Sequence, residues 1–320
     1  MDGVHREDVK AGFQAVESVI SGKVETMTLT AAKPRKMWGV TDKPTENIYV
    51  PMIAVIEKII DETPDTKTFR LRLEDPKQAA EFSWEPGQFV EVTVFGAGEA
   101  PIGFASSPLE KSFFELTVVN RGKVTGMMHE LKEGDKVGIR GPHGNCWPLE
   151  AVKGKDILIV SGGCGLAPLR PAILYILANR KDYGEFWLLY GARTPADLDY
   201  KYDLPEWEKR DDFHVLLTVD VGDESWKGNV GVVTTLLDQV KLDAKNAVAF
   251  TCGPPIMIKF ATMALIKMGF SEDRVVTSIE RYMKCGVGKC GHCCVNHVYL
   301  CTEGPVFTYQ ELQSLPETMA

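Results

Sequence analysis

Hydrophobic and polar positions change their period along this chain, and each change marks a new segment. In the first segment Val9, Phe13, Val16 and Ile20 recur at spacings of four, three and four residues. These spacings place them on one apolar stripe of a helix, which Gly22 could end. The stripe could pack on the rest of the chain or on a partner protein. We therefore expect residues 1–48 to be an N-terminal extension that could carry a partner-docking helix.

From residue 49 to about residue 140, β-branched and aromatic residues form short runs, which turn formers such as Glu85-Pro86-Gly87 separate. Short strands without a long helix between them are typical of a small antiparallel barrel. We expect this barrel to occupy residues 49–150, with one short helix at Met127–Leu131. The predicted strands are Val50–Ile60, Lys67–Leu73, Phe89–Phe95, Phe113–Val119 and Lys136–Arg140.

After Gly154 short apolar runs alternate with helical stretches, which predicts a parallel sheet with helices on both faces over residues 151–279. The predicted strands are Ile157–Val160, Phe186–Tyr190, His214–Val219, Ala247–Thr251 and Val275–Ile279. The predicted helices are Pro168–Asn179, Leu204–Lys209, Val230–Val240 and Pro255–Met268. The fold class is thus β followed by α/β, with residues 280–320 left as a small cysteine-rich lobe.

Composition narrows the class of protein. The length of 320 residues suggests two or three domains. With 44% hydrophobic and 25% charged residues, the composition is that of an ordinary globular protein. A net charge of −8 argues against a nucleic-acid partner. There is no apolar run of about 18 residues and no basic-then-apolar N-terminus, so we expect neither a membrane span nor a secretory signal.

Five of the eight cysteines lie between residues 285 and 301. This crowding favours a metal site in a reducing cytoplasm over a disulfide framework. Four of them have the spacing C-x4-C-x2-C-x7-C, which is close to the plant-type arrangement that holds a [2Fe–2S] cluster. The ligands would be Cys285, Cys290, Cys293 and Cys301.

Zinc remains an alternative, because it also accepts four cysteines, or three with His292 or His297. Structural zinc sites usually carry two C-x2-C pairs, and this segment has only one, so the spacing favours iron–sulfur. We expect Cys294 to be a small packed residue.

Glycine-rich turns mark three candidate nucleotide sites. One turn follows the first predicted strand of the sheet. Its glycines let the backbone close on a pyrophosphate, which would face the N-terminus of the helix that starts at Pro168. The full G-x-G-x-x-G motif is not present. A second turn, Gly122 to Thr125, offers amides and a hydroxyl to a phosphate. A third, Cys252-Gly253-Pro254, places a thiol at the carboxyl edge of the sheet. The first turn contains Gly162, Gly163, Gly165, Leu166, Ala167 and Pro168.

Four segments in this order resemble the ferredoxin–NADP reductase superfamily, from about Tyr49 to Gln310. They resemble its iron–sulfur branch, which includes the electron-transfer subunits of dihydroorotate dehydrogenase, the gamma subunits of sulfhydrogenases and the corresponding subunits of anaerobic sulfite reductases. The segments are residues 134–142, 162–168 and 252–257, and the four cysteines with Gly304-Pro305-Val306-Phe307.

The resemblance implies FAD on the barrel, NAD(P)H on the sheet and a [2Fe–2S] cluster in place of zinc. Arg193 could meet the 2′-phosphate of NADPH, whereas Asp197 and Asp199 argue for NADH, so this choice stays open. Ala100 replaces the family's flavin arginine, which bears on the tightness of FAD binding more than on its identity. The implied flavin contacts are Pro101, Ile102, Gly103, Phe104, Ser106, Gly122, Val124 and Thr125.

For the chemistry, the resemblance implies Cys252 beside the nicotinamide and Glu280 near the flavin. We expect a cytoplasmic, diaphorase-type NAD(P)H-dependent subunit that exchanges electrons with a partner. This partner would be a hydrogenase, a sulfite or heterodisulfide reductase, or a flavoprotein dehydrogenase. The alternatives are a stand-alone NAD(P)H flavin reductase with a structural zinc lobe, and a scaffold without cofactors.

Overall fold

The computed structural model describes residues 47–315, all of which belong to one compact unit. The predicted stripe of Val9, Phe13, Val16 and Ile20 lies outside the described residues. None of the helices between residues 47 and 315 has the length and apolar character that a membrane crossing needs.

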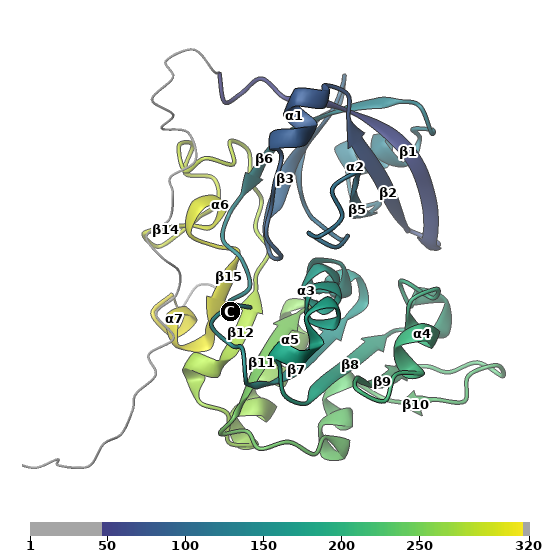
Figure 1. Cartoon of the computed structure of the whole chain (residues 1–320), viewed down its shortest axis with the longest axis vertical. Helices are drawn as coiled ribbons and strands as arrows, with labels where there is room; N and C mark the ends of the chain where they lie inside the picture. The colour runs from purple at the N-terminus through teal and green to yellow at the C-terminus, as the bar shows by residue number, and fades with distance from the viewer. Residues whose placement is uncertain (1–46, 316–320) are drawn as a thin grey trace, which may run out of the picture. The chain divides into compact units, whose positions relative to one another are not determined.

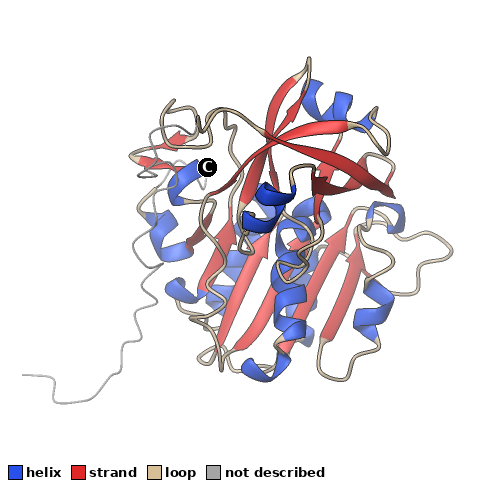
Figure 2. Cartoon of the chain, turned by 45° about the horizontal axis from the view of Figure 1, so that its top comes forward, coloured by secondary structure: helices blue, strands red, loops and turns tan. Residues whose placement is uncertain are grey.

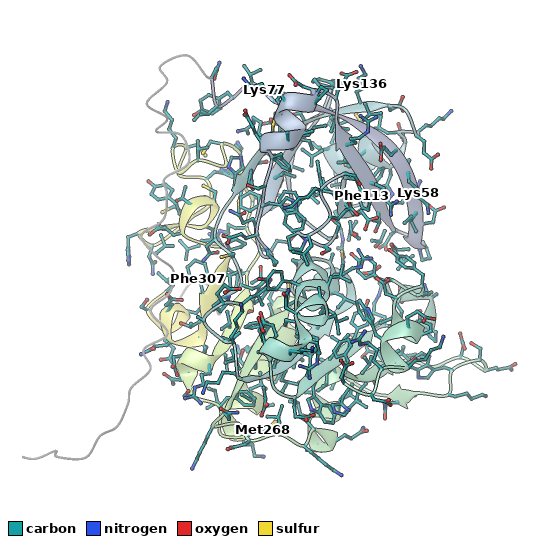
Figure 3. All side chains as sticks on the ribbon, in the orientation of Figure 1. Lys58, Lys77, Phe113, Lys136, Met268 and Phe307 are labelled. Atoms are coloured by element: carbon teal, nitrogen blue, oxygen red, sulfur yellow. The ribbon has the colours of Figure 1, made fainter. Side chains whose placement is uncertain are left out.

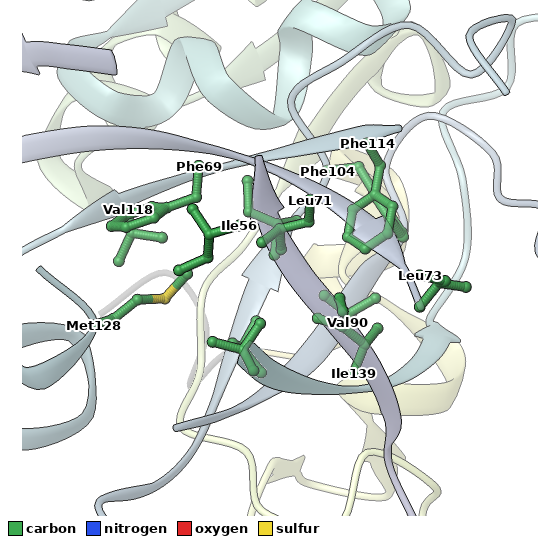
Figure 4. Close-up of a cluster of buried hydrophobic side chains, with 14 of the residues drawn as sticks. Ile56, Phe69, Leu71, Leu73, Val90, Phe104, Phe114, Val118, Met128 and Ile139 are labelled. Atoms are coloured by element: carbon green, nitrogen blue, oxygen red, sulfur yellow. The ribbon is translucent and has the colours of Figure 1, made fainter. Parts of the chain in front are cut away.

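The first part is an antiparallel sheet of six strands in the order β4-β3-β6-β1-β2-β5 (Figure 1). A bridge between Phe104 and Leu116 joins its two ends into a barrel. The barrel encloses Ile56, Phe69, Leu71 and other buried side chains (Figure 4). The elements are β1 (Met52–Thr63), β2 (Thr66–Leu73), α1 (Pro76–Glu81), β3 (Phe89–Val94), β4 (Gly98–Gly103), β5 (Phe114–Val119), α2 (Lys123–His129) and β6 (Lys136–His143).

All five strands predicted for the barrel are confirmed with small shifts at their ends, but the pattern did not predict two elements. Helix α1 forms because the side chain of Asp75 accepts hydrogen bonds from the amides of Lys77 and Gln78. Strand β4 begins at Gly98, within a glycine-rich stretch for which the pattern of apolar residues predicted no strand. Helix α2 begins at Lys123, four residues earlier than predicted.

The second part is a sheet of seven strands in the order β10-β9-β8-β7-β11-β12-β15, parallel except for β15. Figure 2 shows its strands in red beside blue helices. After Asp156 every residue of β7 is buried, as is all of β11, so both faces of the sheet are covered. The elements are β7 (Asp156–Gly162), α3 (Leu166–Ala178), β8 (Phe186–Ala192), α4 (Leu204–Glu208), β9 (His214–Val219), β10 (Asn229–Val230), β11 (Ala247–Cys252), α5 (Pro255–Lys267) and β12 (Val275–Ser278).

The predicted helix Val230–Val240 is wrong in type and extent. Val230 belongs to β10, Gly231 has a positive φ of 130°, and only Val233–Gln239 is helical, as a 3₁₀ helix. The β-branched run from Val232 to Thr235 explains this, because such side chains lose rotamer freedom in an α-helix.

The third part contains β13 (Cys294–Val295), β14 (Val298–Tyr299), α6 (Leu300–Glu303), β15 (Val306–Thr308) and α7 (Tyr309–Gln313). Strand β15 pairs antiparallel with β12, so this part supplies the edge strand of the second. Phe307 on β15, labelled in Figure 3, packs in one apolar cluster with Phe89 of the barrel. The third part shares an apolar cluster with the barrel through Phe89 and another with the sheet through Tyr309. The boundaries at residues 150 and 279 stay predictions.

Candidate functional site

The carboxyl ends of β7 and β11 form the first candidate site. Strands β8 and β9 lie on one side of β7, whereas β11 and β12 lie on the other, so the chain changes direction between β7 and β11. Ligands of such sheets bind at this switch point. The predicted glycines Gly162, Gly163 and Gly165 follow β7, and Cys252, Gly253 and Pro254 lie where β11 ends. The structure thus brings together two turns that are about 90 residues apart in the sequence.

Gly165 is needed for these two turns to meet. A Cβ atom at this position would lie 2.4 Å from the carbonyl oxygen of Cys252 and 2.5 Å from the Cα atom of Gly253. Leu166 and Ala167 are buried in the first turn of α3, so only their backbone could face a nucleotide. The Cβ atom of Pro168 lies 3.6 Å from the place of a Cβ at Gly103, and the end of β4 therefore adjoins the start of α3.

Cys252 is a buried neutral thiol. Burial, with a further contribution from the charge of Glu280, raises the pKa of Cys252 to about 12. At neutral pH it would offer an S–H group beside a bound ligand and would not act as a thiolate nucleophile. Glu280 itself is exposed and lies close enough to influence the thiols of Cys252 and Cys164. The catalytic roles of Cys252 and Glu280 stay predictions.

The predicted flavin contacts divide into two groups. Phe104 is 1% exposed and stacks on Trp84 inside the barrel, with ring centroids 4.1 Å apart. Ser106 is also buried, and its Oγ accepts a hydrogen bond from the amide of Glu115. These two side chains support the barrel and have no free face for a ligand. Pro101, Ile102 and Gly103 are half-buried and remain the flavin candidates on this strand, but the side chain of Ile102 also packs against the barrel core, so its backbone is the part that could meet a flavin.

The turn before α2 is also partly committed to its own structure. The hydroxyl of Thr125 accepts hydrogen bonds from the amides of Arg121 and Gly122, at 3.0 and 3.1 Å. This cap fixes the start of the helix. The amides of Lys123 and Val124 belong to the first helical turn, which has no partners within the helix, so they are the phosphate candidates that remain.

The residues proposed to select the nucleotide lie in different environments. The side chain of Arg193 is 73% exposed and forms an ion pair with Asp197 at 2.7 Å. Asp199, in contrast, is buried, and its amide donates to the hydroxyl of Tyr190. Asp199 therefore cannot meet the ribose of a bound nucleotide. Arg193 keeps its proposed contact with a 2′-phosphate as a prediction.

Asp199 leads to a prediction on stability. Burial, and to a lesser degree the charge of Glu62, raise the pKa of Asp199 from 3.8 to about 7. The folded state thus keeps a proton on Asp199 that the unfolded state loses above pH 3.8. The contribution of this protonated group to the stability of the fold is fully present below pH 3.8 and is lost as the pH rises through 7. The free energy of unfolding of Asp199→Asn, relative to that of the native chain, should therefore rise between pH 4 and pH 7, by about 4 kcal/mol at most. Above pH 7 this difference should stay constant. Thermal unfolding of both proteins at pH 5 and pH 8 tests this, and an equal difference at both pH values would contradict it.

The cysteine loop is shaped for thiolates. The sulfur of Cys285 accepts hydrogen bonds from the amides of Val287, Lys289 and Cys290, at 3.5, 3.3 and 3.4 Å. Burial disfavours the Cys285 thiolate, but these amides outweigh it and lower the pKa of Cys285 to about 7. The amide of Gly288 donates in the same way to the sulfur of Cys301, at 3.1 Å. Such contacts tune a cluster through its sulfurs.

The four predicted ligands lie in two pairs. The amide of Cys290 donates to the sulfur of Cys285 at 3.4 Å, and Cys293 and Cys301 lie in one buried cluster, where their thiols influence each other. Among residues 47–315 no three acidic, histidine or cysteine side chains converge as a single ion requires. Two pairs of thiols fit a core of two irons, each of which takes two thiolates. His292 and His297 are exposed, and the thiol of Cys294 donates to the carbonyl of Asn296, as expected for residues that are not ligands.

Sequence reasoning missed the residues that join the three parts. Arg140, Glu91 and His143 are buried between the barrel and the cysteine loop, and Arg170 is buried between the barrel and α3. Arg140 stands in a strand whose neighbours are apolar, and this was the one signal that could have drawn attention to it.

Three family models match consecutive parts of the chain. The oxidoreductase FAD-binding domain matches residues 53–147, and the oxidoreductase NAD-binding domain matches residues 159–263. The iron-sulfur cluster binding domain of dihydroorotate dehydrogenase B matches residues 280–313. This last match overturns the alternative of a zinc lobe.

Similar proteins agree with these models. Sulfhydrogenase 1 subunit gamma of Pyrococcus furiosus is 38% identical, over 85% of this chain and 96% of the relative. A probable dihydroorotate dehydrogenase B (NAD(+)) electron transfer subunit of Methanocaldococcus jannaschii is 35% identical, over 83% of this chain and 93% of the relative. A structure of an NADH-dependent reduced ferredoxin-NADP oxidoreductase covers 83% of this chain and 92% of its own, with a TM-score of 0.65 and 26% identity. The chain belongs to the family of FAD- and NAD-binding oxidoreductases that end in an iron–sulfur domain of the dihydroorotate dehydrogenase B type.

Proposed function

We propose that this chain is the electron-transfer subunit of a multi-subunit oxidoreductase, with FAD, NAD(P)H and a [2Fe–2S] cluster as its redox groups. The partner would be a hydrogenase, a sulfite or heterodisulfide reductase, or a flavoprotein dehydrogenase. The relatives support this reading, since they are subunits of a sulfhydrogenase and of dihydroorotate dehydrogenase B. Thiolate ligands need a reducing compartment, which supports a cytoplasmic location.

The observation that carries the proposal is the place of β3 between two candidate sites. Phe89 on β3 pairs with Gly103 of the flavin strand β4, and its side chain packs in one cluster with Cys293 and Cys301. FAD, when bound, accepts a hydride from NAD(P)H and exchanges single electrons with an iron–sulfur cluster. One strand thus separates the flavin candidates from the core of the cysteine lobe, which suits electron transfer between them.

The residues of the chain would position the two nucleotides relative to each other. The turns at Gly165 and Gly253 pack closely on each other, whereas nothing lies within 4 Å of the place of a Cβ atom at Gly163, so the open space at the switch point is beside Gly163. The contact of Gly103 with Pro168 holds the flavin strand against this site. Cys252 is protonated and buried, so it would contact the nicotinamide without adding charge.

Cofactor analysis of the purified protein tests the cofactor set and disposes of the scaffold alternative. Anaerobically prepared protein should contain about one FAD, two iron atoms and two sulfides per chain, and should give the spectrum of a [2Fe–2S] cluster after reduction. Stoichiometric zinc without sulfide, or a protein that binds no FAD, would contradict the proposal.

Replacing a single ligand should separate the two halves of the reaction. We expect Cys290→Ser to lose most of its iron and the cluster absorbance, while NAD(P)H still bleaches the flavin absorbance, because the hydride site lies in the first two parts of the chain. Cys294→Ser is the matched control and should keep its iron. If Cys290→Ser loses flavin reduction as well, the cluster lobe is required for the flavin site.

Isolation of the native complex tests the role as a subunit. An affinity-tagged chain, expressed at its natural level and purified without oxygen, should bring down a second oxidoreductase in constant ratio. The isolated chain should reduce one-electron dyes with NAD(P)H. A stable monomer that converts a small organic substrate by itself would show that it is a complete enzyme.

A further inference from the structure

The outer face of the barrel carries a buried polar site under the cysteine loop. On β3 the side chains of Val90 and Val92 face the barrel core, whereas Phe89 and Glu91 point to the other side and are still buried. The cysteine lobe covers them, since a Cβ atom on Gly286 would lie 2.8 Å from the ring of His143 and 3.2 Å from Glu91. The loop that follows Cys285 therefore lies directly on the barrel.

Arg140 is the cation at this contact. Its side chain is 3% exposed, and its Nη1 donates to the carbonyl oxygen of Cys285 at 2.9 Å. Its Nη2 donates to the carbonyl oxygen of Lys284 at 3.3 Å. Glu99 on β4 holds the other side of the guanidinium with two hydrogen bonds of 2.8 and 2.7 Å. A buried charge is thus fixed between the flavin strand and a predicted cluster ligand.

The strand register ties Arg140 to the flavin candidates. Glu91 stands opposite Pro101 on β4 and opposite Arg140 on β6. Residues directly opposite each other share one face of a sheet, and neighbouring strands are about 5 Å apart, so the backbones of Pro101 and Arg140 are about 10 Å apart. The same cation therefore lies beside both sites between which electrons would pass.

We propose that Arg140 positions the cluster loop on the flavin barrel and raises the reduction potential of the cluster, with Glu99 as the counter-charge that orients its guanidinium. The inference rests on the proposed function, because it assigns a role toward the cluster that Cys285 would help to hold. Reduction adds an electron, and a buried cation nearby favours the reduced state more strongly than it would in water.

Removing either member of the ion pair tests the proposal, because the two substitutions should shift the reduction potential of the cluster in opposite directions. We would measure the midpoint potential of the cluster in the purified holoprotein by a redox titration followed by electron paramagnetic resonance. Arg140→Gln should make one-electron reduction about tenfold less favourable, which corresponds to a potential lower by about 59 mV. Glu99→Gln should shift the potential the opposite way, because it removes a negative charge and leaves the cation. Arg140→Lys keeps the charge and should restore most of the native potential.

Arg72→Gln is the matched control, because Arg72 forms an ion pair with Glu57 on the same barrel and the pair is partly exposed. It should leave the potential unchanged. If Arg140→Gln cannot retain iron, Glu99→Gln and Arg140→Lys decide the question. A potential that Glu99→Gln lowers or leaves unchanged would overturn the proposal and reduce the pair to a structural clamp. A native protein without an iron–sulfur signal would instead refute the proposed function.

Discussion

Replacing Arg170 by methionine is expected to destabilise the protein by about 3 kcal/mol, because it breaks a buried ion pair between the barrel and α3. The Nη1 atom of Arg170 donates to the carbonyl oxygen of Ala105 at 2.7 Å and to Glu115 at 2.9 Å, and its Nε donates to Asp203 at 2.7 Å. Without Arg170 the carbonyl of Ala105 stays buried and loses this donor. Glu115 keeps Arg70 at 2.8 Å, which places the cost at the lower end of the range for broken buried pairs.

Thermal unfolding of the holoprotein measures this effect. For a chain of 320 residues, about 3 kcal/mol corresponds to a fall in melting temperature of about 5 °C. Arg210→Met is the control, since the ion pair between Arg210 and Asp212 is exposed and should change stability by less than about 1 kcal/mol. Equal melting temperatures for the two variants would show that the contact between barrel and α3 does not depend on Arg170.

The second large effect is expected at Gly165. Gly165→Ala should slow flavin reduction by NAD(P)H about 100-fold or more, because the added Cβ atom meets backbone atoms 2.4 and 2.5 Å away and the turns must move apart. A displacement of about 1 Å between reacting groups is enough for a loss of this size. Stopped-flow measurement of the flavin absorbance gives the rate, and the FAD and iron contents should not change.

Gly163→Ala serves as the comparison within the same turn. Nothing lies within 4 Å of a Cβ atom at Gly163, although its φ of +53° costs an alanine roughly 1–2 kcal/mol. We expect a loss of about tenfold for this variant. If both variants lose the same activity, the space at the turn, and not the contact between Gly165 and Cys252, limits nucleotide binding.

Much of the fold could be predicted from the period of apolar residues, because each long strand buries at least one face. The strands around Phe69, Ile159 and Phe250 belong to this class. The period failed where local chemistry decides the structure, at the helix that Asp75 caps and at the β-branched run before Gln239. It also could not indicate β15, a strand of three residues that depends on its pairing with β12.

The parts of the candidate site that depend on backbone turns and on the spacing of cysteines could be predicted from the sequence. The glycine turns indicated the ends of β7 and β11, and the cysteine spacing indicated four candidate ligands whose arrangement in two pairs it did not predict. Which residues of the flavin strand face the core could not be predicted from the sequence. Residues two apart share a face of a strand. Ile102 and Phe104 pack on the barrel core, while Pro101 and Gly103 face outward. The buried roles of Arg140 and Arg170 depend on partners far away in the sequence, which no local pattern indicates.

The pairing of β15 with β12 has a consequence for how the chain can be divided. Without Val306–Thr308 the backbone of β12 would present unpaired amides and carbonyls at the margin of the sheet, where Val275 and Val276 supply apolar side chains. Such margins recruit strands from other molecules. A fragment that ends before residue 280 is therefore expected to self-associate through β12. A shortened form of the chain in which the nucleotide-binding sheet does not self-associate must therefore retain β15.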